Sequence, residues 1–251
     1  MNVILIAAIL FACLGGSALL GRYIHRYLPE DHLSADSRDA VKLAMGLVAT
    51  MTALVLGLLV SSAKDSYDTK RSEVIQMAAK VAFLDRVLAL YGPEAAETRD
   101  DLRAAVNDAV GRIWSTDRRG PARLAASHQA GDALYLALQR LSPRDDAQRT
   151  LKTQVQSLVV DLGQLRSLLI AQSIPSISEP MLIILVSWLV VIFFGFSVIA
   201  PPNATTMLAS VASAFSVACA IFLILELDQP FNGLIHIPSE PITNVLSHLG
   251  K

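Results

Sequence analysis

Three runs of the chain contain no Asp, Glu, Lys or Arg, and these runs dominate its hydrophobic pattern. They cover residues 2–21, 43–63 and 180–225. About 20 apolar residues cross a hydrocarbon core of about 30 Å, so each of the first two runs predicts one membrane helix. The third is long enough for two, and Pro201-Pro202-Asn203 predicts a turn between helices over residues 181–200 and 205–225. The pattern therefore predicts four spans.

The first run has one alternative interpretation, a cleaved export signal. Residues 10–13 (LFAC) loosely resemble the lipobox at which bacterial lipoproteins are cut. Only Met1 and Asn2 precede the apolar run, however, and export signals begin with a basic segment. A charge at mid-bilayer costs about 2.5–3.5 kcal/mol on insertion scales, so charge-free runs of this length are not typical of soluble core helices either. We expect the first run to be a retained span.

The segment between the second and third spans is polar and periodic. Residues 64–179 hold most of the 21 basic and 22 acidic residues of the chain. Apolar residues recur there at spacings of three and four, the pattern of amphipathic helices that pack on one another. Breaks fall at Gly92-Pro93, at residues 118–121 and at Ser142-Pro143, with Ser142 a candidate N-cap. We predict four helices, the first of them continuous with the second span because nothing between Ala63 and Val74 breaks a helix.

These elements predict an all-α polytopic membrane protein. Residues 1–63 form the first two transmembrane helices and their loop, 64–179 a soluble four-helix domain, 180–228 a transmembrane hairpin and 229–251 a C-terminal tail. The composition agrees, with 53% hydrophobic residues, 17% charged residues and a mean hydropathy of +0.48. A net charge of −1 argues against a nucleic-acid partner. We expect an integral protein of the bacterial inner (plasma) membrane.

The residue pattern does not predict an enzyme, a cofactor or a metal site. The sequence has no glycine-rich phosphate loop and no nucleophile elbow. Cys13 and Cys219 both fall inside spans, where cysteine behaves as a small apolar residue. No two histidines have the i, i+4 spacing of a metal-binding helix; they are His25, His32, His128, His236 and His248.

Small residues recur every four positions on the second span, at Ala49, Ala53, Gly57 and Ser61. Such a stripe permits close helix approach. Packing within one subunit is the favoured explanation, and a pore-lining face or subunit interface is the alternative. Ser210, Ala214 and Ala218 repeat the spacing on the fourth span.

Two acids, Glu226 and Asp228, lie where the fourth span ends before Pro230. They are either a solvated pair at the membrane interface or, in a symmetric oligomer, a ring of carboxylates that binds cations or tunes permeation. The sequence leaves both alternatives open.

Several motifs resemble those of the bacterial bestrophin-like membrane family. These are Leu84-Asp85-Arg86, Tyr91-Gly92-Pro93-Glu94-Ala95 with Arg99, Ile113-Trp114, and the run from Glu226 to Ile235 (ELDQPFNGLI). Bestrophins are pentameric anion channels with four spans per subunit and a helical cytosolic region, so the resemblance implies a homo-oligomer, by analogy a pentamer, that conducts small inorganic ions. The chain departs from bestrophins in two respects. Bestrophins line the narrow neck of their pore with aromatic and aliphatic residues of the second span, whereas residues 43–66 of this chain contain no aromatic residue. The dense acidic cluster that binds calcium in bestrophins is also absent from the sequence.

Two classes of function follow from these observations. One is an oligomeric ion-conducting pore in the lipid bilayer, which we favour because the second span is polar but uncharged. The other is a non-conducting, membrane-anchored helical scaffold or signalling protein that acts through its soluble domain.

Four spans place both chain ends and the soluble domain on one side of the membrane. Arg22, Arg26, Arg38 and Lys42 lie in or beside the loop on the other side. The positive-inside rule therefore favours an external soluble domain, whereas the resemblance implies a cytoplasmic one. We narrowly favour the charge pattern, which predicts that the soluble domain lies on the external side.

Overall fold

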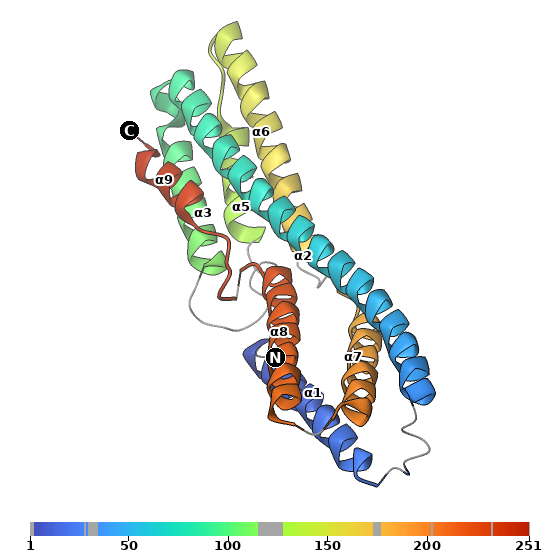
Figure 1. Ribbon diagram of the computed structural model, residues 1–251. Helices are drawn as coiled ribbons and strands as arrows, with labels where there is room; N and C mark the ends of the chain where they lie inside the picture. Colours follow the sequence, from blue (N-terminus) through green and yellow to red (C-terminus); the bar gives the residue numbers. More distant parts are fainter. Residues whose placement is uncertain are drawn as a thin grey trace. The chain divides into compact units, whose positions relative to one another are not determined.

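The computed structural model describes residues 3–27, 29, 35–114, 128–172, 177–201, 203–231 and 233–250. The elements of these residues are all helices (Figure 1). The chain forms two compact units: a membrane unit of Met1–Ser66 with Ser176–Gln229, and a charge-rich unit of Tyr67–Pro175 with Pro230–Lys251. The helix α2 continues from the first unit into the second.

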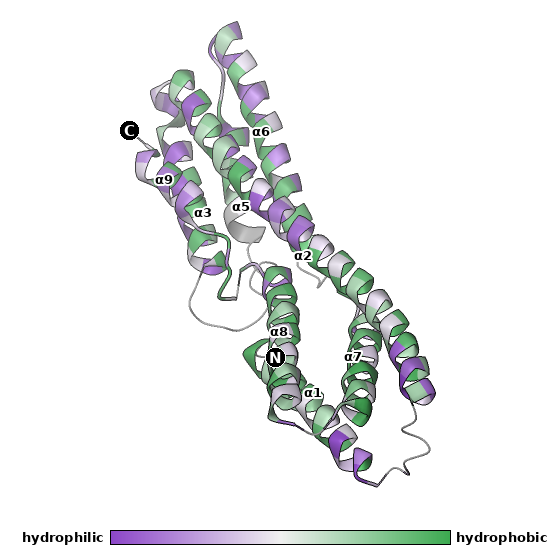
Figure 2. Cartoon of the chain, in the orientation of Figure 1, coloured by the Kyte–Doolittle hydropathy of each residue, from purple (hydrophilic) through white to green (hydrophobic). Residues whose placement is uncertain are grey.

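Four helices of the membrane unit are long and apolar enough to cross a bilayer. They are α1 (Val3–His25), α2 (Ala35–Tyr91), α7 (Glu179–Ile199) and α8 (Ala204–Asp228). Figure 2 shows α7 and α8 coloured as hydrophobic over most of their length. These helices confirm the four predicted spans. Of the predicted turn, Pro201 and Asn203 separate α7 from α8, and Pro202 lies outside the described residues.

The end of α1 lies beside the turn between α7 and α8. The Arg22 guanidinium donates hydrogen bonds to the carbonyl oxygen of Asn203 at 2.7 Å and to Thr206 Oγ1 at 3.3 Å. Asn203 caps α8 by accepting a hydrogen bond from the Thr206 backbone N–H at 2.9 Å. The end of α1 and the α7–α8 turn therefore lie at the same end of the membrane unit, as an alternating four-span topology requires.

Glycine permits the close helix contacts of this unit. A Cβ added at Gly21 of α1 would lie 2.6 Å from the Phe194 carbonyl oxygen of α7. One added at Gly195 of α7 would lie 2.6 Å from Met45 Sδ of α2. At Gly21 the neighbouring atom belongs to the backbone, so a larger residue would force α1 and α7 apart. At Gly195 the neighbouring atoms belong to the flexible side chain of Met45, which would have to move.

The second span and the first helix of the predicted soluble domain form one 57-residue helix, α2, which confirms their predicted continuity. At 1.5 Å per residue, α2 is about 85 Å long. The helix begins at Ala35, eight residues before the charge-free run. Residues 35–42 are polar, but they contain no proline and can therefore be helical.

The charge-rich unit packs the C-terminal half of α2 with α3 (Ala96–Ile113), α5 (His128–Arg140), α6 (Asp146–Ala171) and α9 (Glu240–His248). A short 3-10 turn, η2 (Pro93–Ala95), joins α2 to α3. The predicted break at residues 118–121 lies outside the described residues. The apolar spacing predicted for this segment is confirmed in the core, whose buried members include Val74, Val81, Leu84, Leu88 and Tyr91 of α2 and Val155 of α6.

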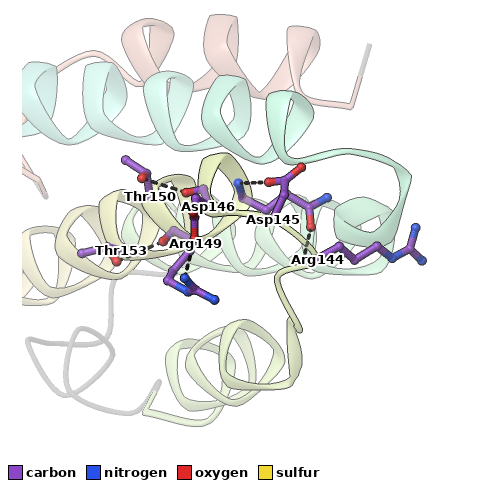
Figure 3. Close-up of polar contacts among 7 residues, drawn as sticks. Arg144, Asp145, Asp146, Arg149, Thr150 and Thr153 are labelled. Atoms are coloured by element: carbon purple, nitrogen blue, oxygen red, sulfur yellow. Dashed lines mark hydrogen bonds and ion pairs between the residues drawn. The ribbon is translucent and has the colours of Figure 1, made fainter.

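The start of α6 differs from the predicted one. Its N-cap is Asp145, whose Oδ1 accepts a hydrogen bond from the Gln148 backbone N–H at 2.7 Å (Figure 3). Gln148 Oε1 in turn accepts one from the Arg144 backbone N–H at 2.8 Å. The prediction that Ser142 caps the helix is therefore wrong. The physical reason is that Asp145 followed by Gln148 completes a reciprocal cap, which serine at 142 lacks.

The C-terminal segment adds a helix to the charge-rich unit. Ile237, Ile242 and Leu249 are 1%, 5% and 3% exposed and belong to its core. The sequence analysis predicted only a C-terminal tail over residues 229–251. The apolar residues of α9 lie on one side, and α9 contacts α3.

Candidate functional site

The small-residue stripe of α2 is largely uncovered in the single chain. Ala53, Gly57 and Ser61 are exposed, and only Ala49 is half-buried. A Cβ at Gly57 would meet no atom within 4 Å. Packing within one subunit, the explanation favoured from sequence, therefore does not account for Ala53, Gly57 and Ser61.

A different face of the same helix is covered. Thr52, Leu59 and Ala63 are 4%, 3% and 0% exposed, and their spacing of seven and four places them on one face. Leu54 and Leu58, by contrast, are 64% and 65% exposed. The span of α2 thus has one covered face, which includes Leu59 and Ala63, whereas Ala53, Gly57 and Ser61 of the stripe are exposed, as are Leu54 and Leu58.

The corresponding stripe on α8 behaves differently. Ala214 and Ala218 are 1% and 5% exposed, and Ser210 is half-buried. The helix α8 contacts α1. The same spacing of small residues therefore serves packing within the chain on α8 and remains uncovered on α2.

Glu226 and Asp228 occupy the last turn of α8 and are 3% and 8% exposed. Both take part in a hydrogen bond or electrostatic interaction. Their burial disagrees with a solvated pair of carboxylates. A helix C-terminus carries a partial negative charge, which disfavours two acids at this place. Keeping both charges buried therefore requires compensation by polar or cationic groups.

In the charge-rich unit, a largely buried ion pair joins Asp85 of the first family-like motif to Arg99, which accompanies the second. Arg99 Nε donates to Asp85 Oδ1 at 2.8 Å, and Arg99 Nη2 donates to Asp85 Oδ2 at 3.0 Å. The side chains are 18% and 12% exposed. This bidentate hydrogen bonding raises the pKa of Arg99 above its ordinary value, against the lowering effect of burial. The pair fixes α3 against α2.

The Tyr91–Ala95 motif forms the turn between those helices. Gly92 has φ of 121°, a conformation that glycine adopts without strain. Gln148 Nε2 donates a hydrogen bond to the Tyr91 carbonyl oxygen at 2.9 Å and so ties α6 to the end of α2. Burial raises the pKa of the Tyr91 phenol, and the charge of Glu94 adds to this effect.

The motifs around Trp114 and Pro230, which are far apart in sequence, meet in this unit. The Trp114 indole Nε1 donates to the Ile237 carbonyl oxygen at 2.8 Å, and its ring lies edge-on to Phe231 with centroids 6.1 Å apart. The Ile237 backbone N–H donates to the Pro230 carbonyl oxygen at 2.8 Å. Asn232 of this motif lies outside the described residues. These contacts give the motifs a structural role in joining the tail to α3.

No cluster of three or more His, Cys, Asp or Glu residues that could hold a metal ion occurs in the part of the chain that the structure describes.

Comparison with known proteins identifies the family of this chain. A family profile named Bestrophin-like domain matches residues 12–242. The chain belongs to the Bestrophin-like family. No curated protein matches it.

Solved structures agree with this bestrophin-like assignment at the level of fold. Two crystal structures of a bacterial bestrophin homologue from Klebsiella pneumoniae, each with a different single mutation, both have a TM-score of 0.73. One is 14% identical, with 96% of this chain and 96% of that chain covered; the other is 16% identical, with 99% and 97% covered. At these identities the match establishes a shared fold. The chain is therefore an integral membrane protein with the fold of a bestrophin homologue.

Sequence reasoning missed two features of the bestrophin-like chain. Arg22 was read only as a topology signal, yet it binds the α7–α8 turn. The apolar spacing of Ile242, Val245 and Leu249 was the available signal for α9.

Proposed function

We propose that this protein forms a homo-oligomeric, channel-like pore for small inorganic ions, with the small-residue stripe of α2 at subunit contacts or along the ion path. The supporting observation is the exposure of Ala53, Gly57 and Ser61 in the single chain. The family membership and the bestrophin-homologue fold support the same proposal.

The chemistry of the stripe suits both roles. Small side chains let helix backbones approach closely, so Gly57 and Ala53 favour contact with a second copy over contact with lipid tails. The hydroxyl of Ser61 and that of Thr50, which is also exposed, supply polar groups for a wettable surface. Thr50 Oγ1 satisfies its donor at the Gly46 carbonyl oxygen, 2.9 Å away, so it costs little in lipid.

Glu226 and Asp228 are the proposed ion-ring positions. Symmetry would repeat each carboxylate once per subunit, and a ring of negative charge attracts cations. Their burial in the single chain means that the ring would act through the field near the path rather than by direct contact with hydrated ions. Resemblance to bestrophins favours five subunits.

The test of conduction is ion flux from purified protein in liposomes. We expect flux above that of empty liposomes, and Ala53→Trp should reduce it because a bulky ring would fill the stripe. Leu208→Trp is the matched control, because Leu208 is 71% exposed on α8 and away from the stripe. Glu226→Gln should lower the cation-to-anion permeability ratio, whereas Glu240→Gln on the exposed start of α9 should not.

Oligomerisation is tested separately by native mass spectrometry in mild detergents. Gly57→Leu should weaken the oligomer, because Gly57 is exposed on the proposed contact face. Gly16→Leu on α1 is the control, since a Cβ at Gly16 also meets no atom within 4 Å. A wild-type monomer in several mild detergents would contradict the proposal.

A scaffold acting through the charge-rich unit is the second candidate. Phe83 and Leu90 of α2 are 48% and 62% exposed in that unit, although a soluble surface seldom exposes neighbouring large apolar residues without a partner. Two results together would favour the scaffold over the pore. The first is ion flux no greater than that of empty liposomes. The second is a partner that co-purifies with the wild type and is lost in Phe83→Ser and Leu90→Ser.

For localisation we propose the bacterial inner membrane with the charge-rich unit outside, as the basic loop residues favour. Labelling of a single cysteine at Leu90 by an impermeant maleimide in spheroplasts, in a background with Cys13 and Cys219 replaced by serine, measures the orientation. Labelling only after membrane permeabilisation would reverse it.

A further inference from the structure

A groove in the membrane unit is lined by residues of α1, of the end of α7 and of the first half of α8. Its volume is about 350 Å³, within the usual range for small-molecule sites. Phe11, Leu19 and Met207 are among its apolar lining residues, and Gly15 and Gly16 also line it. The groove therefore presents a shallow apolar surface on helices that cross the bilayer.

Glycine keeps the groove open. A Cβ at Gly15 or at Gly16 would meet no atom within 4 Å, so neither glycine is required for helix contact inside the chain. Leu19 and Met207 at the edges are 59% and 49% exposed. An acyl chain can lie in such a groove and make the dispersion contacts that Gly15 and Gly16, which have no side chains, do not make.

One end of the groove is positively charged. Arg22 lines it and is half-buried. Both of its hydrogen bonds, to Asn203 and Thr206, use Nη2, which leaves guanidinium donors at Nε and Nη1. Among the described residues, no carboxylate forms an ion pair with Arg22. Thr206 also belongs to the first turn of α8, whose dipole adds partial positive charge at this place.

We propose that this groove binds an anionic phospholipid, with the phosphate at Arg22 and one acyl chain along Gly15 and Gly16. The assignment rests on the match between the groove and an amphiphile: a cation with spare donors at one end and an apolar furrow beyond it. Arginine pairs with phosphate through parallel N–H donors, and basic pockets between membrane helices select anionic headgroups. The site is independent of ion conduction and of the number of subunits.

Native mass spectrometry of the full-length, delipidated protein tests the site by titration with phosphatidylglycerol or phosphatidylcholine of the same acyl chains. We expect phosphatidylglycerol to bind about tenfold more tightly, and Arg22→Gln to remove that preference, as expected for the loss of one charge-assisted interaction. Arg26→Gln is the matched control, because Arg26 is exposed near the same end of α1 and does not line the groove. Gly16→Leu should weaken binding of both lipids by filling the furrow.

Five results would overturn the proposal, and four of them concern binding. They are equal binding of the two lipids by the wild type, an equal loss of preference in Arg26→Gln, unchanged binding in a folded Gly16→Leu variant, and full competition by inorganic phosphate alone. The last would identify a phosphate site without an acyl-chain site. Dissociation of the oligomer by Gly16→Leu would also overturn it, because the groove would then be covered by a second copy.

Discussion

Removing the ion pair between Asp85 and Arg99 should destabilise the charge-rich unit by an amount that its geometry sets. Two charge-assisted hydrogen bonds of 2.8 and 3.0 Å join side chains that are 12% and 18% exposed. Each such bond contributes about 1.5–3 kcal/mol, and a lone buried charge left behind adds a penalty. Because some water reaches the pair, we expect Asp85→Asn and Arg99→Gln each to cost about 2–3 kcal/mol of unfolding free energy, with a coupling of about 1–2 kcal/mol in the double mutant.

Trp114 provides the signal for this measurement. The chain has two tryptophans, so Trp188→Phe leaves Trp114, which packs in the charge-rich unit, as the only one. Urea titration of the full-length protein in non-ionic micelles, followed by Trp114 fluorescence, gives the unfolding free energy by linear extrapolation. The hydrogen bonds to Asp85 raise the pKa of Arg99 above its ordinary value, which agrees with a pair that stabilises the folded state.

The surface pair Asp146–Arg149 is the control for this cycle. Its N–O distance is 2.5 Å, but its side chains are 93% and 70% exposed, so its coupling should be about 0.5 kcal/mol or less. A coupling for Asp85 and Arg99 that is no larger than the control value would refute the argument that burial and bidentate geometry make this motif a stabilising contact.

Three further outcomes are expected. Gly21→Ala should lower the free energy of unfolding, measured by thermal melting in detergent, by about 1–2 kcal/mol, because its Cβ would lie 2.6 Å from a backbone oxygen. Gly16→Ala, whose Cβ meets no atom within 4 Å, should be neutral or stabilising. Equal effects of the two substitutions would contradict the close approach at Gly21. Tyr91→Phe should be neutral or stabilising by up to about 1 kcal/mol at pH 7, because the buried Tyr91 hydroxyl has no hydrogen-bond partner among the described residues. Because the folded-state pKa of Tyr91 lies above its ordinary 10.0, the wild type should also lose stability in urea as the pH rises above 10, and the variant should lose less. Asp145→Ala should cost about 1 kcal/mol by circular dichroism melting, and Ser142→Ala almost nothing; the reverse order would restore Ser142 as the cap.

The sequence by itself determined the elements whose causes are local. A bilayer interior admits only charge-free segments of about 20 residues with all backbone hydrogen bonds made internally, so the runs at 2–21, 43–63 and 180–225 had to be helical spans. The proline pair at 201 had to divide the third run, and the absence of any break after Ala63 gave the continuous α2. The prediction of Ser142 as the cap was wrong because Asp145, three residues later, is also a suitable cap residue, and its hydrogen bond from the Gln148 backbone N–H fixes the helix start there.

Only the tertiary structure decided which faces these helices cover. The stripes on α2 and α8 have the same four-residue spacing, yet Ala214 is 1% exposed and Gly57 is open. Spacing defines a face of a helix, whereas burial depends on which distant helix lies against it. The same holds for Trp114 and Phe231, whose contact joins segments more than 100 residues apart, and for Arg22, which the sequence marks as a charge and the fold places at the end of a groove.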